Sequence, residues 1–308
     1  MKKCIISLLS IALLLLALCG CGKQRMALNH ISEDVFYEKS TLQTKVTDEQ
    51  GNSYYAEDRL KVISYNIRYT NDKNGHSIKE RAPRLKKVLE KYDADLLGIQ
   101  EFTPKWEKHL PLFEEQYDYV LNYRSSEDVE AAPIFWKRSK FKLLDHGLFW
   151  LSETPEQESR GWGAKHWRIC QWVKLENRQS GSAFYFLNTH FDFEDAPQVG
   201  SARLLIEKAQ TDFKDAPVII TGDFNMERQS EGYYFMSRYF TDVNMATEQS
   251  NIGTYTGYGE TSELIDYTFI SQEGIKPLTY RVMTEMFDGK YVSDHYGIYT
   301  EQVLLKNN

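Results

Sequence analysis

Residues 217–225 read PVIITGDFN, a short apolar run that ends in polar side chains. An apolar run rich in β-branched residues is typical of a strand covered on both faces, as in the sheets of α/β proteins. Asp223 and Asn225 stand just beyond this strand, where the sheet fixes side chains and the following loop leaves room for a substrate. The segment therefore predicts a buried sheet with a functional site at its edge.

Three other segments repeat this construction. LKVISYN at 60–66 and ADLLGIQ at 94–100 predict strands that end at Asn66 and just before Glu101, and AFYFLN at 183–188 predicts a strand that leads to His190. A lone Asp or Asn after a strand is usually a turn residue, so each position alone carries little weight. Near the end of the chain, further titratable residues adjoin predicted strands: Asp266, Asp294 and His295.

The remaining pattern predicts many strands with a few interspersed helices. We expect strands over 119–123, 133–136, 141–144, 168–175, 264–271, 278–283 and 298–305, and helices over 84–92, 106–117, 203–213 and 231–239. This order favours a layered α/β or α+β domain built on sheets packed face to face. No internal repeat or second linker interrupts residues 59–308, which we interpret as one catalytic domain.

Composition narrows the classes of function. The 308 residues are 42% hydrophobic and 26% charged, which excludes wholesale disorder. The formal net charge is -7, so the chain lacks the uniform positive field with which non-specific binders of duplex DNA displace counterions. A nuclease would also need Lys and Arg clustered near its site, and the clearest local group, within residues 137–142, is small.

The N-terminus predicts export. Lys2 and Lys3 precede an apolar run over residues 5–18 that is too short to span a bilayer comfortably, which is typical of a signal peptide over residues 1–20. Gly20 before Cys21 fits a bacterial lipobox, so we expect Cys21 to carry lipid and residues 21–58 to form a polar tether; cleavage without lipidation is the alternative. Only Cys170 then remains, as a buried structural thiol.

The order of the polar motifs resembles the endonuclease/exonuclease/phosphatase superfamily, and the resemblance covers residues 60–305. It implies a deoxyribonuclease I-like four-layer sandwich, in which two packed mixed β-sheets are flanked by helices. PIFW at 133–136, FWLSETP at 149–155 and RGW at 160–162 resemble an exported lipoprotein branch of bacteria. The superfamily motifs are SYNIR at 64–68, GIQE at 98–101, NTHFD at 188–192, TGDFN at 221–225, IDY at 265–267 and SDH at 293–295.

The resemblance also implies hydrolysis of a phosphoester. His295 would be the base that takes a proton from the attacking water, and Asp266 would orient its ring. Asp223 and Asn225 would position the water and the phosphoryl oxygens. His190 would donate to a non-bridging oxygen whose negative charge grows in the transition state.

A divalent cation belongs to the same expectation. Glu101 and Asn66 offer hard oxygen ligands, which suit Mg²⁺, with Mn²⁺ as a substitute, better than they suit zinc. Asp294 would be a third ligand or a hydrogen-bond acceptor beside His295. Arg68 and Arg168 are candidate phosphate contacts, because a guanidinium can meet two oxygens at once, although an ion-paired arginine is as common in such a position.

The leading hypothesis is a monomeric, lipid-anchored, magnesium-dependent phosphoesterase outside the cytoplasm. Its substrate would be a lipid head group, a sugar or inositol phosphate, or a nucleic acid. The alternatives are a deoxyribonuclease I-like nuclease and a binding lipoprotein that has lost catalysis. Glu263-Leu264 replaces the basic or small polar residue common before Ile265 in the family, which puts the usual substrate contact there in doubt.

Overall fold

The computed structural model describes residues 26–32, 44–48, 51 and 53–305. The predicted signal peptide over residues 1–20 and the predicted lipid site Cys21 lie outside this range. Within it, none of the helices combines the length and the apolar character needed to cross a bilayer.

Two six-stranded sheets form the centre of the fold, and both are mixed because β3 runs parallel to β4 and β9 parallel to β10. The first sheet has the order β13 (Ile275–Met283), β14 (Gly297–Leu304), β3 (Arg59–Asn66), β4 (Leu96–Gln100), β6 (Ile134–Lys137) and β5 (Tyr117–Val120). The second has the order β11 (Phe240–Asp242), β12 (Asp266–Ser271), β10 (Val218–Asp223), β9 (Ala183–His190), β8 (Ile169–Asn177) and β7 (Phe141–Trp150).

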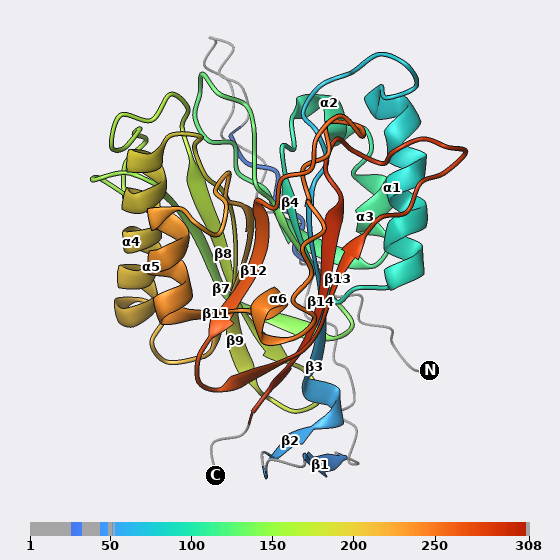
Figure 1. Ribbon diagram of the computed structural model, residues 1–308. Coiled ribbons are helices and arrows are strands. Elements are labelled where there is room, and N and C mark those ends of the chain that lie inside the picture. The colour runs from blue at the N-terminus through green and yellow to red at the C-terminus, as the bar shows by residue number, and fades with distance from the viewer. Residues whose placement is uncertain (1–25, 33–43, 49–50, 52, 306–308) are drawn as a thin grey trace, which may run out of the picture.

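Helices cover the outer face of each sheet, which gives the four layers visible in Figure 1. On the first sheet lie α1 (Ile78–Tyr92), α2 (Pro104–Glu107) and α3 (Pro111–Glu114), and on the second α4 (Asp195–Thr211) and α5 (Glu231–Tyr239). The short helix α6 (Val243–Ala246) follows β11. The predicted sandwich of two mixed sheets flanked by helices is confirmed.

Alternating side chains divide the core into layers. In β10, Ile219 belongs to the apolar cluster between the sheets, whereas Ile220 belongs to the cluster beneath α4 and α5. In β3, Val62 and Ile63 divide in the same way between the inter-sheet cluster and the one beneath α1. Both strands are therefore covered on two faces, as their continuous apolar sequences predict.

Three helix boundaries differ from the predicted ones. The helix predicted at 84–92 begins at Ile78, because the Glu80 carboxylate accepts the backbone N–H of Ser77 at 3.1 Å and so caps the first turn. The helix predicted at 106–117 is two four-residue helices, α2 and α3, the second of which begins at Pro111. The helix predicted at 203–213 begins at Asp195.

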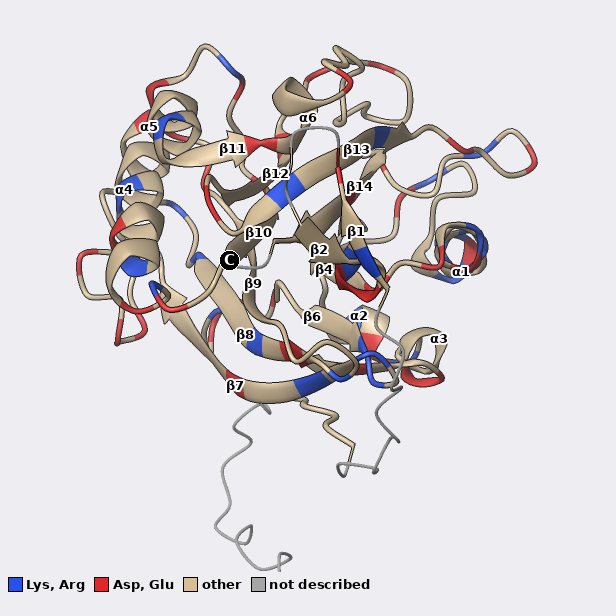
Figure 2. Ribbon diagram, turned by 90° about the horizontal axis from the view of Figure 1, so that it is seen from below, with Lys and Arg blue, Asp and Glu red and all other residues tan. Residues whose placement is uncertain are grey.

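Part of the predicted tether lies against the domain. Leu28 and His30 donate backbone hydrogen bonds to the carbonyls of Leu121 and Tyr119, at 2.9 and 3.0 Å. The strands β1 (Lys45–Thr47) and β2 (Ser53–Tyr55) form a hairpin, which the 3₁₀ turn at Ala56–Asp58 joins to β3. Seen from below in Figure 2, basic and acidic positions are interspersed along the helices and strands.

A polar network joins the two sheets just below the edge where β4, β9 and β10 end. Gln100 donates to Oδ1 of Asn188 at 2.7 Å, and Asn188 donates to the carbonyls of Ile99 and Pro133. Gly98 lies opposite this network, and a Cβ there would stand 2.6 Å from Oδ1 of Asn188. The sheets therefore approach each other closely enough at this level that position 98 excludes any side chain.

Replacing Gly98 by alanine is expected to lower the free energy of unfolding by about 1–3 kcal/mol, the usual penalty for overpacking a core. The new methyl group would lie 2.1 Å from Oγ1 of Thr221, so the network must shift. Urea titration of Gly98→Ala beside Ser139→Ala, which changes an exposed turn residue, measures the difference. Stability within about 0.5 kcal/mol of wild type, as for ordinary surface changes, would contradict this packing.

Candidate active site

The predicted polar residues meet at one edge of the two sheets. His190 and Asp223 end the parallel strands β9 and β10, in which they are paired in register. Asp266 begins β12, which runs antiparallel to β10, and it pairs with Asp223 from the other side. The ends of parallel strands and the start of an antiparallel one share an edge, which is why residues far apart in sequence converge here.

His295 and Asp266 form a buried hydrogen-bonded pair. Nδ1 of His295 lies 2.9 Å from Oδ2 of Asp266, and both residues are under 5% exposed. Thr254 holds the backbone of Asp266, because its hydroxyl oxygen accepts the backbone N–H of Asp266 at 3.1 Å. The ring of Tyr255 packs against His295 with centroids 5.0 Å apart. Asp266 thus holds the imidazole through Nδ1, and the other ring nitrogen, Nε2, points away from the Asp266 carboxylate.

Neighbouring carboxylates control the protonation of this pair. Burial acts to lower the pKa of His295, but the charges of Asp266 and Asp223 outweigh it and raise the pKa to about 10. Burial and then the charge of Asp266 raise the pKa of Asp223 to about 7. Oδ2 of Asp223 lies 3.6 Å from Nε2 of His295. One carboxylate therefore faces each ring nitrogen of His295: Asp266 faces Nδ1 and Asp223 faces Nε2.

His190 faces Asp223 from the other strand. Its Nε2 lies 3.5 Å from Oδ2 of Asp223, and its Nδ1 lies 3.2 Å from both Nη2 of Arg124 and Oε1 of Glu130. Burial, and then the positive charges of Arg168 and Arg124, hold the pKa of His190 well below 6.5. The ring is therefore neutral at physiological pH. Arg124 can only donate to Nδ1 and Glu130 can only accept from it, so these contacts are compatible with either neutral tautomer.

Glu101 and Asn66 lie side by side on the first sheet. The amide nitrogen of Asn66 donates to Oε1 of Glu101 and to Oδ2 of Asp223, each at 3.0 Å. The second oxygen of Glu101 accepts the backbone N–H of Tyr69 at 2.7 Å. Glu101 adopts φ of 60°, an uncommon backbone conformation for a residue with a side chain and one that often marks functional positions.

Arg68 is ion-paired with acidic neighbours. Its Nε donates to Oδ2 of Asp72 at 3.0 Å, and its Nη1 lies 3.3 Å from Oδ2 of Asp294. Burial lowers the pKa of Arg68, but the hydrogen bond to Asp72 and the charge of Asp294 outweigh it, so the net shift is upward. Burial raises the pKa of Asp294, which directly precedes His295 in the loop before β14.

Asn225 stabilises the loop that follows β10. Its amide nitrogen donates to the carbonyl of Phe191 at 2.9 Å, and its backbone N–H donates to Oδ1 of Asp223 at 3.0 Å. The residue adopts φ of 49°, a conformation that asparagine tolerates better than most residues. Asn225 thus fixes the direction of the Asp223 carboxylate.

Sequence reasoning missed Arg124 and Glu130, which flank His190. Arg124 follows the strand predicted at 119–123, so the rule that found Asn66 and Glu101 would have found it too. Glu130 lies in a loop before β6 and carries no comparable signal. The buried Cys170 carries no chemistry, since burial raises the pKa of its thiol well above the usual range.

Two groups of side chains offer ligands for a cation. Asp223, Asp266 and His295 lie close enough together to surround one, with ligand atoms within 4.8 Å of one another. In this group, Nδ1 of His295 and Oδ2 of Asp266 are already joined by a hydrogen bond of 2.9 Å. Glu101 and Asn66 offer carboxylate and amide oxygens, the hard ligands that Mg²⁺ prefers, so this pair fits a divalent cation by its chemistry.

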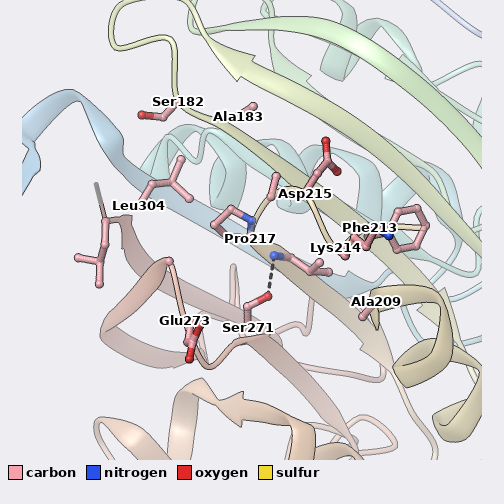
Figure 3. Close-up of a pocket in the computed structure, with 14 residues that line it drawn as sticks. Ser182, Ala183, Ala209, Phe213, Lys214, Asp215, Pro217, Ser271, Glu273 and Leu304 are labelled. Carbon is pink, nitrogen blue, oxygen red and sulfur yellow. Dashed lines mark hydrogen bonds between the residues drawn. The ribbon is translucent and has the colours of Figure 1, made fainter. Parts of the chain in front are cut away.

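A separate hollow lies at the opposite end of the second sheet (Figure 3). Its lining comes from the start of β10, the end of β12 and the C-terminal end of β14, and includes Pro217, Ser271 and Leu304. The backbone N–H of Val218 donates to the Ser271 hydroxyl there, at 2.8 Å. None of the predicted catalytic residues lines this hollow, so it is distinct from the site at the other edge.

The two-sheet sandwich and its buried edge site define a hydrolase of the deoxyribonuclease I-like class. The chain belongs to the endonuclease/exonuclease/phosphatase family, whose model matches residues 63–295. The matched range includes all six motifs in full, since SYNIR begins at Ser64 and SDH ends at His295. The family resemblance of the motifs is therefore confirmed.

Two solved structures share this fold across most of the chain. A mannosyl-6-phosphatase of Bacteroides thetaiotaomicron is 29% identical, with a TM-score of 0.74 over 80% of this chain and 100% of that one. A family protein of Bacteroides vulgatus is 25% identical, with a TM-score of 0.74 over 80% of this chain and 99% of that one.

Curated relatives are more distant and longer. Sphingomyelinase C 2 of Leptospira interrogans is 24% identical over 290 residues, which cover 78% of this chain and 45% of that protein. A 3′-5′-exoribonuclease subunit of the Saccharomyces cerevisiae CCR4-Not complex is 24% identical over 280 residues, which cover 70% of this chain and 33% of that protein. The chain thus spans less than half the length of either relative.

Proposed function

We propose that the protein is a magnesium-dependent phosphoesterase in which a water activated by His295 and Asp266 attacks phosphorus. The observation that carries this proposal is the buried 2.9 Å hydrogen bond between these two residues, set beside an edge of carboxylates and a neutral histidine. A binding protein that has lost catalysis would have no need to retain a base, its orienting carboxylate and hard oxygen ligands together.

Each side chain has a role that its contacts support. Nε2 of His295 takes the proton of the attacking water, while Asp266 stabilises the imidazolium that forms. Oδ2 of Asp223 lies within 3.6 Å of Nε2 of both His295 and His190. From this position between the two histidines, the Asp223 carboxylate orients the attacking water. The neutral His190 donates from Nε2 to a phosphoryl oxygen as charge grows there, and Asn225 holds the Asp223 carboxylate in place.

Glu101 and Asn66 are the residues proposed to hold the cation, with Asp294 as a nearby third acidic group. Bound there, Mg²⁺ or Mn²⁺ would neutralise phosphate charge and help the leaving oxygen depart. Arg68, which contacts Asp294, balances the acidic charge at this end of the site. The carboxylate-rich edge would otherwise repel an anionic substrate.

The substrates proposed are lipid head groups and sugar or inositol phosphates. The similarity to a mannosyl-6-phosphatase and to a sphingomyelinase supports both classes. A nuclease is the second candidate, since the exoribonuclease subunit is also a relative, but the net charge of -7 gives it little electrostatic help. Hydrolysis confined to nucleic acids in a screen of the purified mature chain against all these classes would reverse this order.

We also propose that the enzyme acts as a monomer outside the cytoplasm, anchored to a bacterial membrane through lipid on Cys21. The signal-peptide and lipobox patterns support this location. Cell fractionation tests the anchor: the wild-type protein should be found with the membrane. Release of unlipidated protein into the medium would contradict it.

The rate should rise with pH above 6.5 as His295 loses its proton. The base must be neutral, and Asp266 and Asp223 stabilise its protonated form, so the raised pKa of His295 moves the ascending limb to higher pH. Asp266→Asn removes one of these charges, so its limb should move to lower pH while its maximal rate falls. Profiles of kcat/KM against pH measure both effects. If the ascending limb of Asp266→Asn lay at the wild-type pH, the limb would not report the ionisation of His295.

A further inference from the structure

Arg168 is a buried guanidinium with unused hydrogen-bond donors. The residue directly precedes β8 and is 3% exposed. Its Nε and Nη1 are buried, and no group within the described ranges accepts a hydrogen bond from either. A buried charged donor without an acceptor is costly, so such a group in a folded protein needs an explanation.

The nearest carboxylates do not supply the missing acceptors. Oδ2 of Asp192 is 3.8 Å from Nε and Oε1 of Glu130 is 3.9 Å from Nη1, both beyond hydrogen-bond distance. Both carboxylates have partners elsewhere: Asp192 accepts the backbone N–H of His166 at 3.1 Å, and Glu130 contacts Arg124. These neighbours balance the charge of Arg168 and leave its donors available.

Arg168 also lies close to the reacting centre and near the surface. Oε1 of Glu130, which is 3.9 Å from Nη1 of Arg168, also lies 3.2 Å from Nδ1 of His190. The ring of Phe193 packs over the guanidinium, with its centroid 5.5 Å from Cζ, and this ring is 59% exposed. A single aromatic side chain therefore separates the donors of Arg168 from solvent on that side.

Arg124 has a different part in the same corner of the site. Its guanidinium contacts Glu130, pairs with Asp128 at 3.3 Å and lies 3.2 Å from Nδ1 of His190. Its donors are thus engaged within the protein, where they orient His190. Arg168 remains as the buried cation whose donors can meet a ligand.

We propose that Arg168 binds an unesterified oxygen of the substrate phosphate and thereby selects phosphate monoesters over diesters. This inference rests on the proposed function. Three groups would each take one phosphoryl oxygen: the cation proposed at Glu101 and Asn66, the ring of His190, and the guanidinium of Arg168. A monoester has three non-bridging oxygens and up to two negative charges, whereas a diester has two such oxygens and a single charge. A buried guanidinium therefore discriminates in favour of the monoester.

The test compares p-nitrophenyl phosphate with bis(p-nitrophenyl) phosphate, which share a leaving group. We expect the wild type to prefer the monoester. Arg168→Lys should lower kcat/KM for the monoester by about 10- to 100-fold, the size expected for losing hydrogen bonds to a charged group, and should lower kcat/KM for the diester by a clearly smaller factor. Arg160→Lys, which alters an exposed arginine stacked on Trp167, is the matched control.

A binding measurement separates this inference from the proposed function. Calorimetric titration with inorganic phosphate should show a similar loss of affinity in Arg168→Lys and none in Arg160→Lys. Equal losses on both esters, or unchanged phosphate affinity in Arg168→Lys, would overturn the role of Arg168 even if the enzyme is a phosphoesterase. Circular dichroism checks folding; should Arg168→Lys not fold, a wild-type preference for the diester would overturn the inference.

Discussion

Replacing His295 by alanine is expected to lower phosphoester hydrolysis by about 10²- to 10⁴-fold, the contribution usual for general acid–base catalysis. Nδ1 of this histidine is held by Asp266, and Nε2 lies 3.6 Å from Asp223, where an attacking water must give up its proton. The substitution should also abolish the ascending limb of the pH profile, because the ionising base is gone.

His146→Ala is the control for this change, since His146 is an exposed histidine on β7. Asp266 is left without its buried partner in His295→Ala, so His295→Gln, which keeps a polar side chain of similar length, guards against loss of fold. Thermal unfolding of each variant should stay cooperative. A folded His295→Gln enzyme with near-wild-type kcat/KM would remove His295 as the base.

The second large effect is expected at Glu101. Glu101→Gln keeps the shape of the side chain and an oxygen that can accept from Asn66 or Tyr69, which both donate to Glu101, but it removes the negative charge proposed to hold the cation. Loss of a residue that merely supports a metal ligand costs about 10- to 100-fold in affinity, so loss of the ligand charge should raise the magnesium concentration for half-maximal activity by on the order of 100-fold.

Magnesium titration of the hydrolysis rate measures this effect. Glu90→Gln, at an exposed glutamate on α1, should leave the titration unchanged. High magnesium should partly restore Glu101→Gln, whereas it should not restore a variant damaged in its base. A Glu101→Gln enzyme that is activated by magnesium at wild-type concentrations would place the cation elsewhere.

The sequence predicts the site well because its residues stand at strand ends. Asn66, His190 and Asp223 each end an apolar run, and strands of this kind are recognisable without knowledge of the partners they pair with. The two-sheet architecture follows from the number of such strands and from the family resemblance. The register that sets Asp223 between His190 and Asp266 is a long-range property that only the folded chain displays.

Helix boundaries were predicted less well, for identifiable reasons. The Ser77 and Glu80 pair that caps α1 is a recognisable local signal, but Pro83 suggested a later start. In α4, Gly200 interrupts the apolar period because Trp162 packs on it, and a Cβ there would lie 2.1 Å from the indole. Tertiary packing thus explains a residue that local propensity counts against the helix.

The charge pattern around His190 could be predicted only in part. Arg168 stood out in the sequence, but its value as a ligand depends on Glu130 and Asp192 lying just too far away to bond it. Distances of this kind depend on loops, and loop sequences lack the hydrophobic periodicity from which helices and strands are predicted. Arg68 donates a hydrogen bond to a carboxylate, whereas Nε and Nη1 of Arg168 donate none, and this difference emerges only from the folded structure.

The most direct test of the account is the magnesium dependence of phosphoester hydrolysis by the purified protein. The rate of phosphate release from a panel of sugar, inositol and lipid phosphoesters is measured with chelator, and again after magnesium is restored. We predict turnover of at least one class that stops with chelator and returns with magnesium. Turnover that is indifferent to chelator, or no turnover of any phosphoester with magnesium present, would contradict it.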